Sequence, residues 1–319
     1  MADDIDEMIA ALKGQAPVGP PVAPLIANAI EHTASLPQRA IQNSQFALDT
    51  GAYDPQPTME AAAQLTTGGM PVAEAGAAGI FGGKLARTAD LKALSEAKQM
   101  AISGKHPEDV WNATGWFRSP ADKQWRFEIP DNNLKINHMP VGEDDTVSSI
   151  YAHNLVNHPE LFQAYPELKS VQTSVTKDSR FPTGYGLYQN NGMGRSIGVP
   201  APNSEAARSV MAHELQHGVQ DLEGFSYGSD PSYYAGLIES GLKKRPDLLE
   251  GNKFRDVINQ ADKLYRGTAG EVEARNVQRR LDATPSNRLI APWYTQDTPY
   301  INQYHHDPVT GMVKALTQK

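Results

Sequence analysis

The segment from residue 203 to residue 224, NSEAARSVMAHELQHGVQDLEG, limits the fold more than any other part of the chain. Asn203 or Ser204 can cap a helix that starts here, Glu205 suits its first turn, and Gly224 suits its end. Apolar side chains cover most of the helix circumference. The remaining strip is narrow and polar, and it consists of Ser209, Gln216, Gln220 and Glu223. Such a helix must be buried on most sides with its strip towards solvent, so the chain has to build a core around it.

This helix contains the sequence HELQH. His213 and His217 are four residues apart and share one face, where two imidazoles can bind one zinc ion about 2.0–2.1 Å from each nitrogen. Glu214 would lie beside the open coordination position, where a carboxylate can act as general base. The alternative is two hydrogen-bonded core histidines and a paired glutamate. Burial of three such groups without an ion would be costly, which favours the metal site.

A catalytic zinc site also needs a third protein ligand. Because the chain has no cysteine, that ligand must be a histidine or a carboxylate. The segment YRGTAGEVEARNVQRRLDA predicts a second helix that starts near Gly270. Glu271 and Glu273 flank its apolar stripe on opposite sides, and helical phase alone does not choose between them.

The residues Glu271-Val-Glu-Ala274-Arg275 resemble the E-x-x-A-D/N pattern of the gluzincins, zinc peptidases of the HExxH-plus-Glu type. The resemblance implies Glu271 as the third ligand, with Glu273 as the alternative. Arg275 departs from the pattern, because a carboxylate or amide that braces the first histidine is expected there. The gap between ligands is also long (271 − 217 = 54 residues), which implies an insertion at about 226–252 that lines or covers the cleft.

The chemistry that follows is peptide hydrolysis. Zinc bound by His213, His217 and Glu271 would lower the pKa of its water towards about 7, and Glu214 would pass the proton to the leaving amine. The segment RSIGV, residues 195–199, directly precedes the helix and is expected to be the edge strand that pairs with an extended substrate. The oxyanion could be stabilised by one of four tyrosines, among which the sequence does not choose: Tyr227, Tyr233, Tyr234 and Tyr265.

Composition divides the chain near residue 105. Residues 1–105 are rich in Ala, Gly and Pro, which predicts a poorly ordered N-terminal arm with short helices at 3–13 and 24–48. Residues 106–319 contain all four tryptophans and are expected to form one α+β, zincin-like domain. In this domain a small antiparallel sheet, including a hairpin at 115–130, would pack on the motif helix and on a second ligand-bearing helix.

Charge and hydropathy exclude several kinds of partner. A formal charge of −8 and a pI near 5.6 argue against a nucleic-acid partner, which would need a basic surface for phosphates. No run of about 18 apolar residues predicts a transmembrane segment, and the acidic start MADDIDEMIAALK is unlike a secretory signal. The absence of cysteine suits a reducing compartment. The expected partner is therefore a protein or peptide substrate.

Five blocks in order resemble the large polyvalent protein-associated domains of bacteriophages and conjugative elements, over about residues 85–305. They are TGWFRSPADKQWRFEIPD, HPELFQAYPEL, HELQHGVQDLEGF, YRGTAGEVEARNVQRR and APWYTQDTP. The resemblance implies a zinc metallopeptidase of phage or prophage origin, located in the bacterial host cytoplasm or the virion, whose arm could contact a virion or host protein. The alternative is a catalytically inert virion or effector binding module on a zincin fold. Glu214 favours the enzyme, because a structural metal needs no base.

Overall fold

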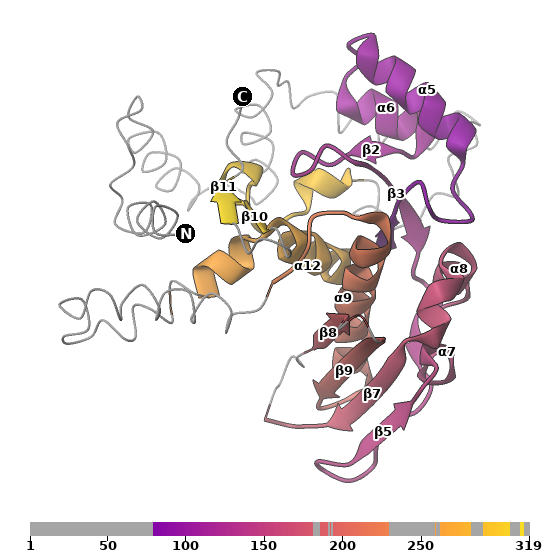
Figure 1. The fold of residues 1–319 in the computed structure, drawn as a ribbon, viewed down its shortest axis with the longest axis vertical. Coiled ribbons are helices and arrows are strands. Elements are labelled where there is room, and N and C mark those ends of the chain that lie inside the picture. The colour runs from indigo at the N-terminus through magenta and orange to yellow at the C-terminus, as the bar shows by residue number, and fades with distance from the viewer. Residues whose placement is uncertain are drawn as a thin grey trace, which may run out of the picture.

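The computed structural model of the chain describes residues 79–180, 186–190, 192, 194–229, 259, 262–281, 290–306 and 313–315. These residues form a mixed α+β fold (Figure 1). The helices predicted at 3–13 and 24–48, and most of the predicted insertion, lie outside the described residues. In the part of the chain that the structure describes, no helix is long and apolar enough to cross a membrane.

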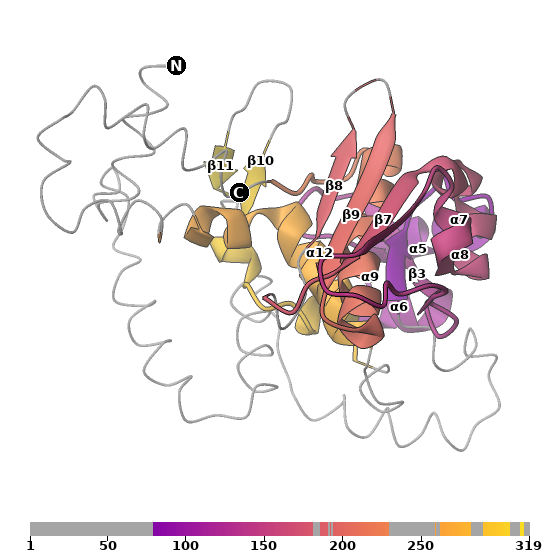
Figure 2. The same cartoon turned by 90° about the horizontal axis from the view of Figure 1, so that it is seen from below.

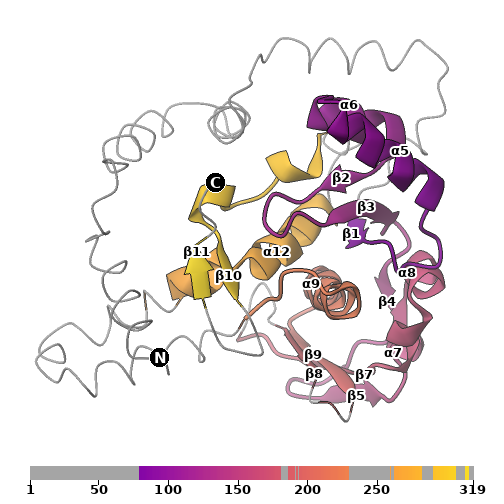
Figure 3. The same cartoon turned by 45° about the horizontal axis from the view of Figure 1, so that its top comes forward.

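Two long helices, α9 (Ser204–Glu223) and α12 (Ala269–Leu281), pack side by side at the centre (Figure 3). The predicted ends of α9 are confirmed. The side chain of Asn203 accepts a hydrogen bond from the backbone N–H of Ala206, and Gly224 follows the helix with a φ of 66°, which glycine adopts readily. The predicted second helix is α12, which starts one residue before Gly270.

A four-stranded sheet lies across α9 (Figure 2). Its order is β5 (Thr146–Ser149), β7 (Gln172–Lys177), β9 (Arg195–Ala201) and β8 (Leu187–Asn190). The pairs β5–β7 and β8–β9 are antiparallel, whereas β7 and β9 are parallel.

The prediction that residues 195–199 form the edge strand was wrong. They belong to β9, which pairs with β7 on one side and with β8 on the other. The segment before β9 folds back as a hairpin strand, so that β8 is the edge strand on this side of the sheet and β5 is the edge strand on the other. The edge strand is therefore about eight residues earlier in the chain than predicted, and it runs antiparallel to its neighbour.

A smaller sheet covers the other side of α9. It consists of β1 (Gly79–Gly82), β3 (Trp125–Pro130) and β2 (Phe117–Arg118), all antiparallel. The hairpin predicted at 115–130 is confirmed as β2 and β3. Two antiparallel pairs complete the strands: β4 (Lys135–Ile136) with β6 (Val156–Asn157), and β10 (Tyr304–His306) with β11 (Val313–Ala315).

Short helices surround these layers. They are α5 (Leu91–Ile102), α6 (Pro107–Thr114), α7 (Ala152–Leu155), α8 (Pro159–Ala164), and the 3₁₀ turns η1 (Pro166–Ser170), η3 (Pro292–Tyr294) and η4 (Tyr300–Asn302). Leu94 and Ala97 of α5 pack on Val110 of α6 and on Trp116, which forms a small second core beside the main one.

Residues 79–105, which were predicted to belong to the arm, are part of this fold. Ile80 and Phe81 of β1 are buried in the main core, and β1 pairs with β3 along its whole length. The predicted boundary at residue 105 therefore does not separate β1 and α5 from the rest of the domain.

Three residues of the polar strip of α9, Gln216, Gln220 and Glu223, are buried and not exposed to solvent as predicted. Gln216 is fully buried, and its Oε1 accepts a hydrogen bond of 2.8 Å from the backbone N–H of Phe81. Two turns further along, Oε1 of Glu223 accepts from the backbone N–H groups of Leu85 (2.8 Å) and Ala86 (3.1 Å). Gln216 and Glu223 looked solvent-exposed because several of their partners are backbone groups 135 residues or more upstream, which no side-chain pattern reveals.

Candidate metal centre

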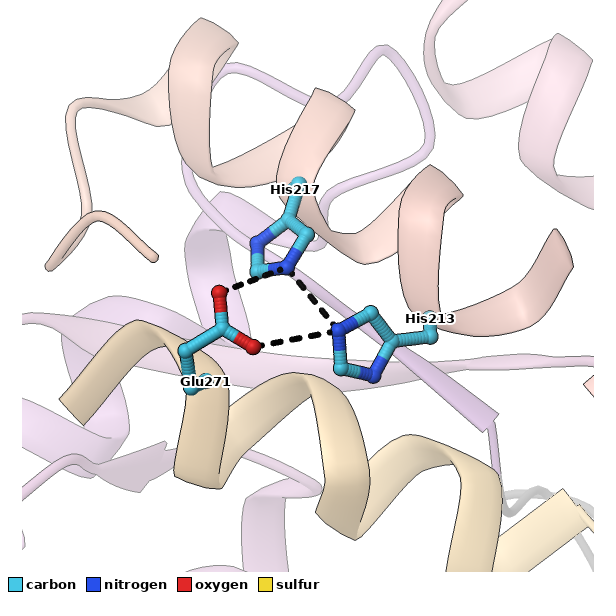
Figure 4. Close-up of side chains that lie close together, drawn as sticks. All are labelled: His213, His217 and Glu271. Carbon is cyan, nitrogen blue, oxygen red and sulfur yellow. Dashed lines mark hydrogen bonds and ion pairs between the residues drawn. The ribbon is translucent and has the colours of Figure 1, made fainter. Parts of the chain in front are cut away.

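Three side chains from α9 and α12 point towards one another (Figure 4). Nε2 of His213 lies 3.0 Å from Nε2 of His217. The two carboxylate oxygens of Glu271 lie 3.3 Å from Nε2 of His213 and 3.2 Å from Nε2 of His217. The structure thus brings together three of the residues selected from the sequence, in a group that could hold a metal ion.

The spacing of these atoms suits a metal. Ligand atoms about 2.0–2.1 Å from a tetrahedral zinc ion are about 3.3–3.4 Å from one another, and the separations here are 3.0–3.3 Å. Glu271 is only 2% exposed, and its Oε2 has no hydrogen-bond partner among the described residues. A buried carboxylate oxygen without a hydrogen bond is costly unless a cation lies beside it. The donor set therefore fits a divalent cation.

Two glutamines orient the imidazoles. Nδ1 of His217 lies 2.8 Å from Oε1 of Gln220, and Nδ1 of His213 lies 2.9 Å from Oε1 of Gln278. A carbonyl oxygen can only accept, so each Nδ1 carries the hydrogen and each Nε2 keeps a lone pair that faces the centre. Two lone pairs and a carboxylate directed at one point repel one another unless a proton or a metal ion lies between them.

In the metal-free centre a proton supplies this charge. Burial alone would lower the pKa of His217, but the Glu271 carboxylate outweighs burial and raises that pKa to about 9. Burial likewise tends to raise the pKa of Glu271, but His217 and His213 hold it well below its usual value. At neutral pH the centre is therefore an ion pair, and a metal ion that binds here would have to displace its proton.

Glu273, the alternative third ligand, lies in a different environment. Its Oε2 is 2.5 Å from Nε of Arg126 on β3, and the other two guanidinium nitrogens bond to both oxygens of Asp122 (2.9 and 2.8 Å). Its Oε1 accepts hydrogen bonds from two glutamine amides of α9. Glu273 thus pairs with groups of the protein itself, and Glu271 is the residue beside the imidazoles.

Glu214, the predicted base, is buried next to the edge strand. It is 3% exposed, and the backbone N–H of Tyr188 on β8 donates a hydrogen bond to its carboxylate. A Cβ at Gly186 would overlap Oε1 of Glu214, so glycine is what allows β8 to approach this closely. Burial raises the pKa of Glu214, against the opposing effect of His213 and His217. Its carboxylate thus holds a proton more readily than an exposed glutamate does.

The chain after α9 closes the centre from another direction. A Cβ at Gly228 would overlap Oε1 of Glu271 and the ring of His217, and the backbone N–H of Ser229 donates to Oε1 of Glu271 at 3.1 Å. Backbone atoms of Tyr227 pack on Gly270 at the start of α12. This loop therefore holds the Glu271 carboxylate against His217.

Of the four candidate oxyanion residues, Tyr265 contacts the centre. Its hydroxyl hydrogen-bonds to Glu271, and burial followed by the charge of Glu271 raises the pKa of Tyr265. Tyr227 lies in the loop after α9, whereas Tyr233 and Tyr234 lie outside the described residues.

The braces of the histidines were not predicted from the sequence. Arg275, at the position where a brace was expected, forms an ion pair with Asp297 (2.7 Å). Gln278, almost one turn further along α12, binds His213 instead. Its spacing of seven residues from Glu271 places both on one face of the helix, and this was the available signal.

Comparison with known proteins found a match for only one part of the chain. Residues 79–137 match the model of a family described as large polyvalent protein associated domain 23. The match is narrower than the resemblance over about 85–305. It covers β1, α5, α6, β2, β3 and β4, and it ends before the two helices that carry the metal centre. Neither the curated proteins nor the solved structures contain a match to the chain.

Proposed function

We propose that this protein is a zinc-dependent peptidase with a zincin-like arrangement. The observation that supports it is the convergence of His213, His217 and Glu271 within 3.3 Å of one another, with Glu214 next to the first histidine. Two imidazoles and one carboxylate leave a fourth tetrahedral position open, which is typical of catalytic rather than structural zinc. The ligands are all oxygen and nitrogen, which zinc accepts readily.

When bound, zinc would lower the pKa of a water in the open position and polarise the scissile carbonyl. Glu214 would take the proton of the attacking water and deliver it to the leaving amine. A buried carboxylate with a raised pKa suits both steps, because it accepts a proton and then returns it. Tyr265, whose hydroxyl contacts Glu271, would be the candidate donor of a hydrogen bond to the developing oxyanion.

The edge strand β8 supports a peptide as the substrate. Among the strands that the structure describes, it pairs with β9 alone, and it lies directly beside Glu214. An extended chain can pair with such an edge through its backbone, which brings its peptide bonds to the catalytic group irrespective of most side chains.

The test is Glu214→Gln in the full chain. We expect the kcat for hydrolysis of a broad peptide library to fall by about 10²–10⁴-fold, while zinc content stays at one ion per chain. Atomic absorption gives the zinc content and mass spectrometry gives the cleaved bonds. Equal cleavage by the wild type and by Glu214→Gln would refute the role of Glu214.

An inert binding module on the same scaffold is the second candidate. It is favoured by the family match, which covers none of the three ligands, and by the deep burial of Glu214. This candidate predicts that zinc-loaded wild-type protein cleaves no member of the library. The proposed setting is a phage or prophage, with the protein in the bacterial host cytoplasm or the virion and a virion or host partner bound by the residues that precede β1. Mass spectrometry of purified particles would test the virion location.

A further inference from the structure

Gln220 lies directly behind the imidazole of His217, and its amide can be oriented in one way only. Its Nε2 donates to the backbone carbonyl of Gly270 (3.0 Å) and to Oε1 of Glu273 (3.1 Å). Both partners are acceptors, so a flipped amide would place its oxygen against two other oxygens. The Oε1 of Gln220 must therefore face Nδ1 of His217, 2.8 Å away.

Glu273 is held as an acceptor by its other neighbours. Its Oε1 also receives Nε2 of Gln216 (3.0 Å), whose own Oε1 is bound by the backbone N–H of Phe81 (2.8 Å). Its Oε2 faces the guanidinium of Arg126. Each of these neighbours presents a hydrogen to the carboxylate. A chain of fixed hydrogen-bond directions thus runs from β1 and β3, through Glu273 and Gln220, to His217.

We propose that Glu273 and Gln220 are positioning residues, which hold His217 as the Nδ1–H tautomer so that its Nε2 lone pair faces the metal. The proposal rests on the metal centre proposed above. Glu273, the alternative third ligand, thus has a different role: it is linked to the metal-binding imidazole of His217 by two hydrogen bonds, through Gln220. The proposal also gives the segment that matches the family model a part in the centre, through Arg126.

Zinc affinity of the full chain, measured by competition with a chromophoric chelator, tests this. Gln220→Met and Glu273→Gln should each weaken zinc binding by about 10–100-fold, the usual effect of losing an outer partner of a metal-bound histidine. If Glu273 acts through Gln220, the double variant should bind zinc no more weakly than Gln220→Met alone. Additive losses would overturn the proposal.

The chain offers a matched control. Arg280 on α12 forms a second buried ion pair with Glu128 on β3 (2.7 Å), so Arg126–Glu273 and Glu128–Arg280 both join the same strand to the same helix. Glu128→Gln should destabilise the fold in a similar way and leave zinc affinity within about threefold of the wild type. An equal loss of affinity in Glu128→Gln would show that Glu273 acts only through general stability.

Nitrogen NMR of zinc-free protein, at a pH where His217 is neutral, gives a readout that stability does not affect. The wild type should show the hydrogen on Nδ1, and Gln220→Met should lose this preference. An unchanged tautomer in Gln220→Met would overturn the proposal even if Glu273→Gln does not fold. If the wild-type protein binds no zinc, both the peptidase proposal and the positioning proposal fail. If it binds zinc but cleaves no peptide, the peptidase proposal fails, and the measured zinc affinities still support the positioning role.

Discussion

Two buried polar regions meet along α9 and α12, and they balance their charges differently. In the seam, formed by Gln216, Gln220, Glu223, Glu273 and Arg126, both oxygens of Glu273 and Oε1 of Glu223 are paired with amides, backbone N–H groups, a hydroxyl or a guanidinium. The centre, formed by His213, His217 and Glu271, directs its lone pairs at a point where a proton or a metal is needed. Glu271 and Glu273 are two residues apart. The comparison teaches that the neighbours of a buried carboxylate, more than its burial, separate a structural acid from a candidate ligand.

The largest expected effect is a loss of folding stability when the seam is disrupted. Arg126→Met removes the cation between Asp122 and Glu273, whose side chains are no more than 10% exposed. Removal of one partner from a buried ion pair costs about 3–5 kcal/mol, and urea unfolding of the zinc-free protein would measure it. Arg87→Met, which removes an exposed arginine from its pair with the exposed Glu167, should change the unfolding midpoint little. Similar losses in both variants would contradict the account of the seam.

The next effect concerns the centre. Zinc should raise the free energy of unfolding by about 2.7 kcal/mol at a free concentration 100 times its Kd, because it binds the folded state. Glu271→Gln should remove most of this increase, since an amide oxygen carries no charge to offset the cation. Calorimetry with and without zinc measures the change. Glu205→Gln, on the exposed first turn of α9, is the control and should keep the full increase.

The third effect is a pH dependence that only the centre should show. Because the folded pKa of His217 is raised to about 9, zinc must displace a proton below that pH. Zinc affinity should therefore rise about tenfold per pH unit towards pH 9 and then level off. The zinc-free protein should show the opposite trend. The stability that this proton contributes is complete below the unfolded pKa of about 6.5 and is lost as the pH rises through 9. Titration calorimetry across this range measures the zinc affinity, and urea unfolding at each pH measures the stability of the zinc-free protein. An affinity independent of pH would contradict the proposed ion pair.

The smallest effects separate the base from the ligands. Gly186→Ala would push on Glu214, and Gly228→Ala would push on Glu271 and His217. Each should cost about 1–3 kcal/mol in strain. The first should lower the rate of peptide hydrolysis with zinc affinity kept, and the second should lower zinc affinity. Gly194→Ala, where an added Cβ meets nothing within 4 Å, should do neither. A loss of zinc affinity in Gly186→Ala, or a loss of hydrolysis with full zinc affinity in Gly228→Ala, would contradict these two contacts.

Local signals predicted much of this architecture. The caps Asn203 and Gly224 defined α9, the alternating aromatic residues of 115–130 defined a hairpin, and the i, i+4 spacing placed His213 and His217 on one face. These features depend on residues close in sequence, which is why they could be predicted.

Features set by distant contacts could not be predicted in this way. Helical phase left Glu271 and Glu273 open, because the choice depends on Arg126, which pairs with Glu273 from 147 residues upstream (273 − 126 = 147). Gln216 and Glu223 looked solvent-exposed because their partners include backbone groups of a distant Ala/Gly-rich segment. The edge strand was assigned to β9 since nothing in β8 marks it as the outer strand.

The strand β1 bears on how a smaller version of the protein could be produced. A fragment cut at residue 106 would retain the metal ligands and the hairpin, but the amide of Gln216 and the carboxylate of Glu223 would lose their backbone partners. The apolar surface that Ile80 and Phe81 now cover would be open to water. Anyone preparing a trimmed sample for crystals or spectroscopy should therefore begin it at or before residue 79.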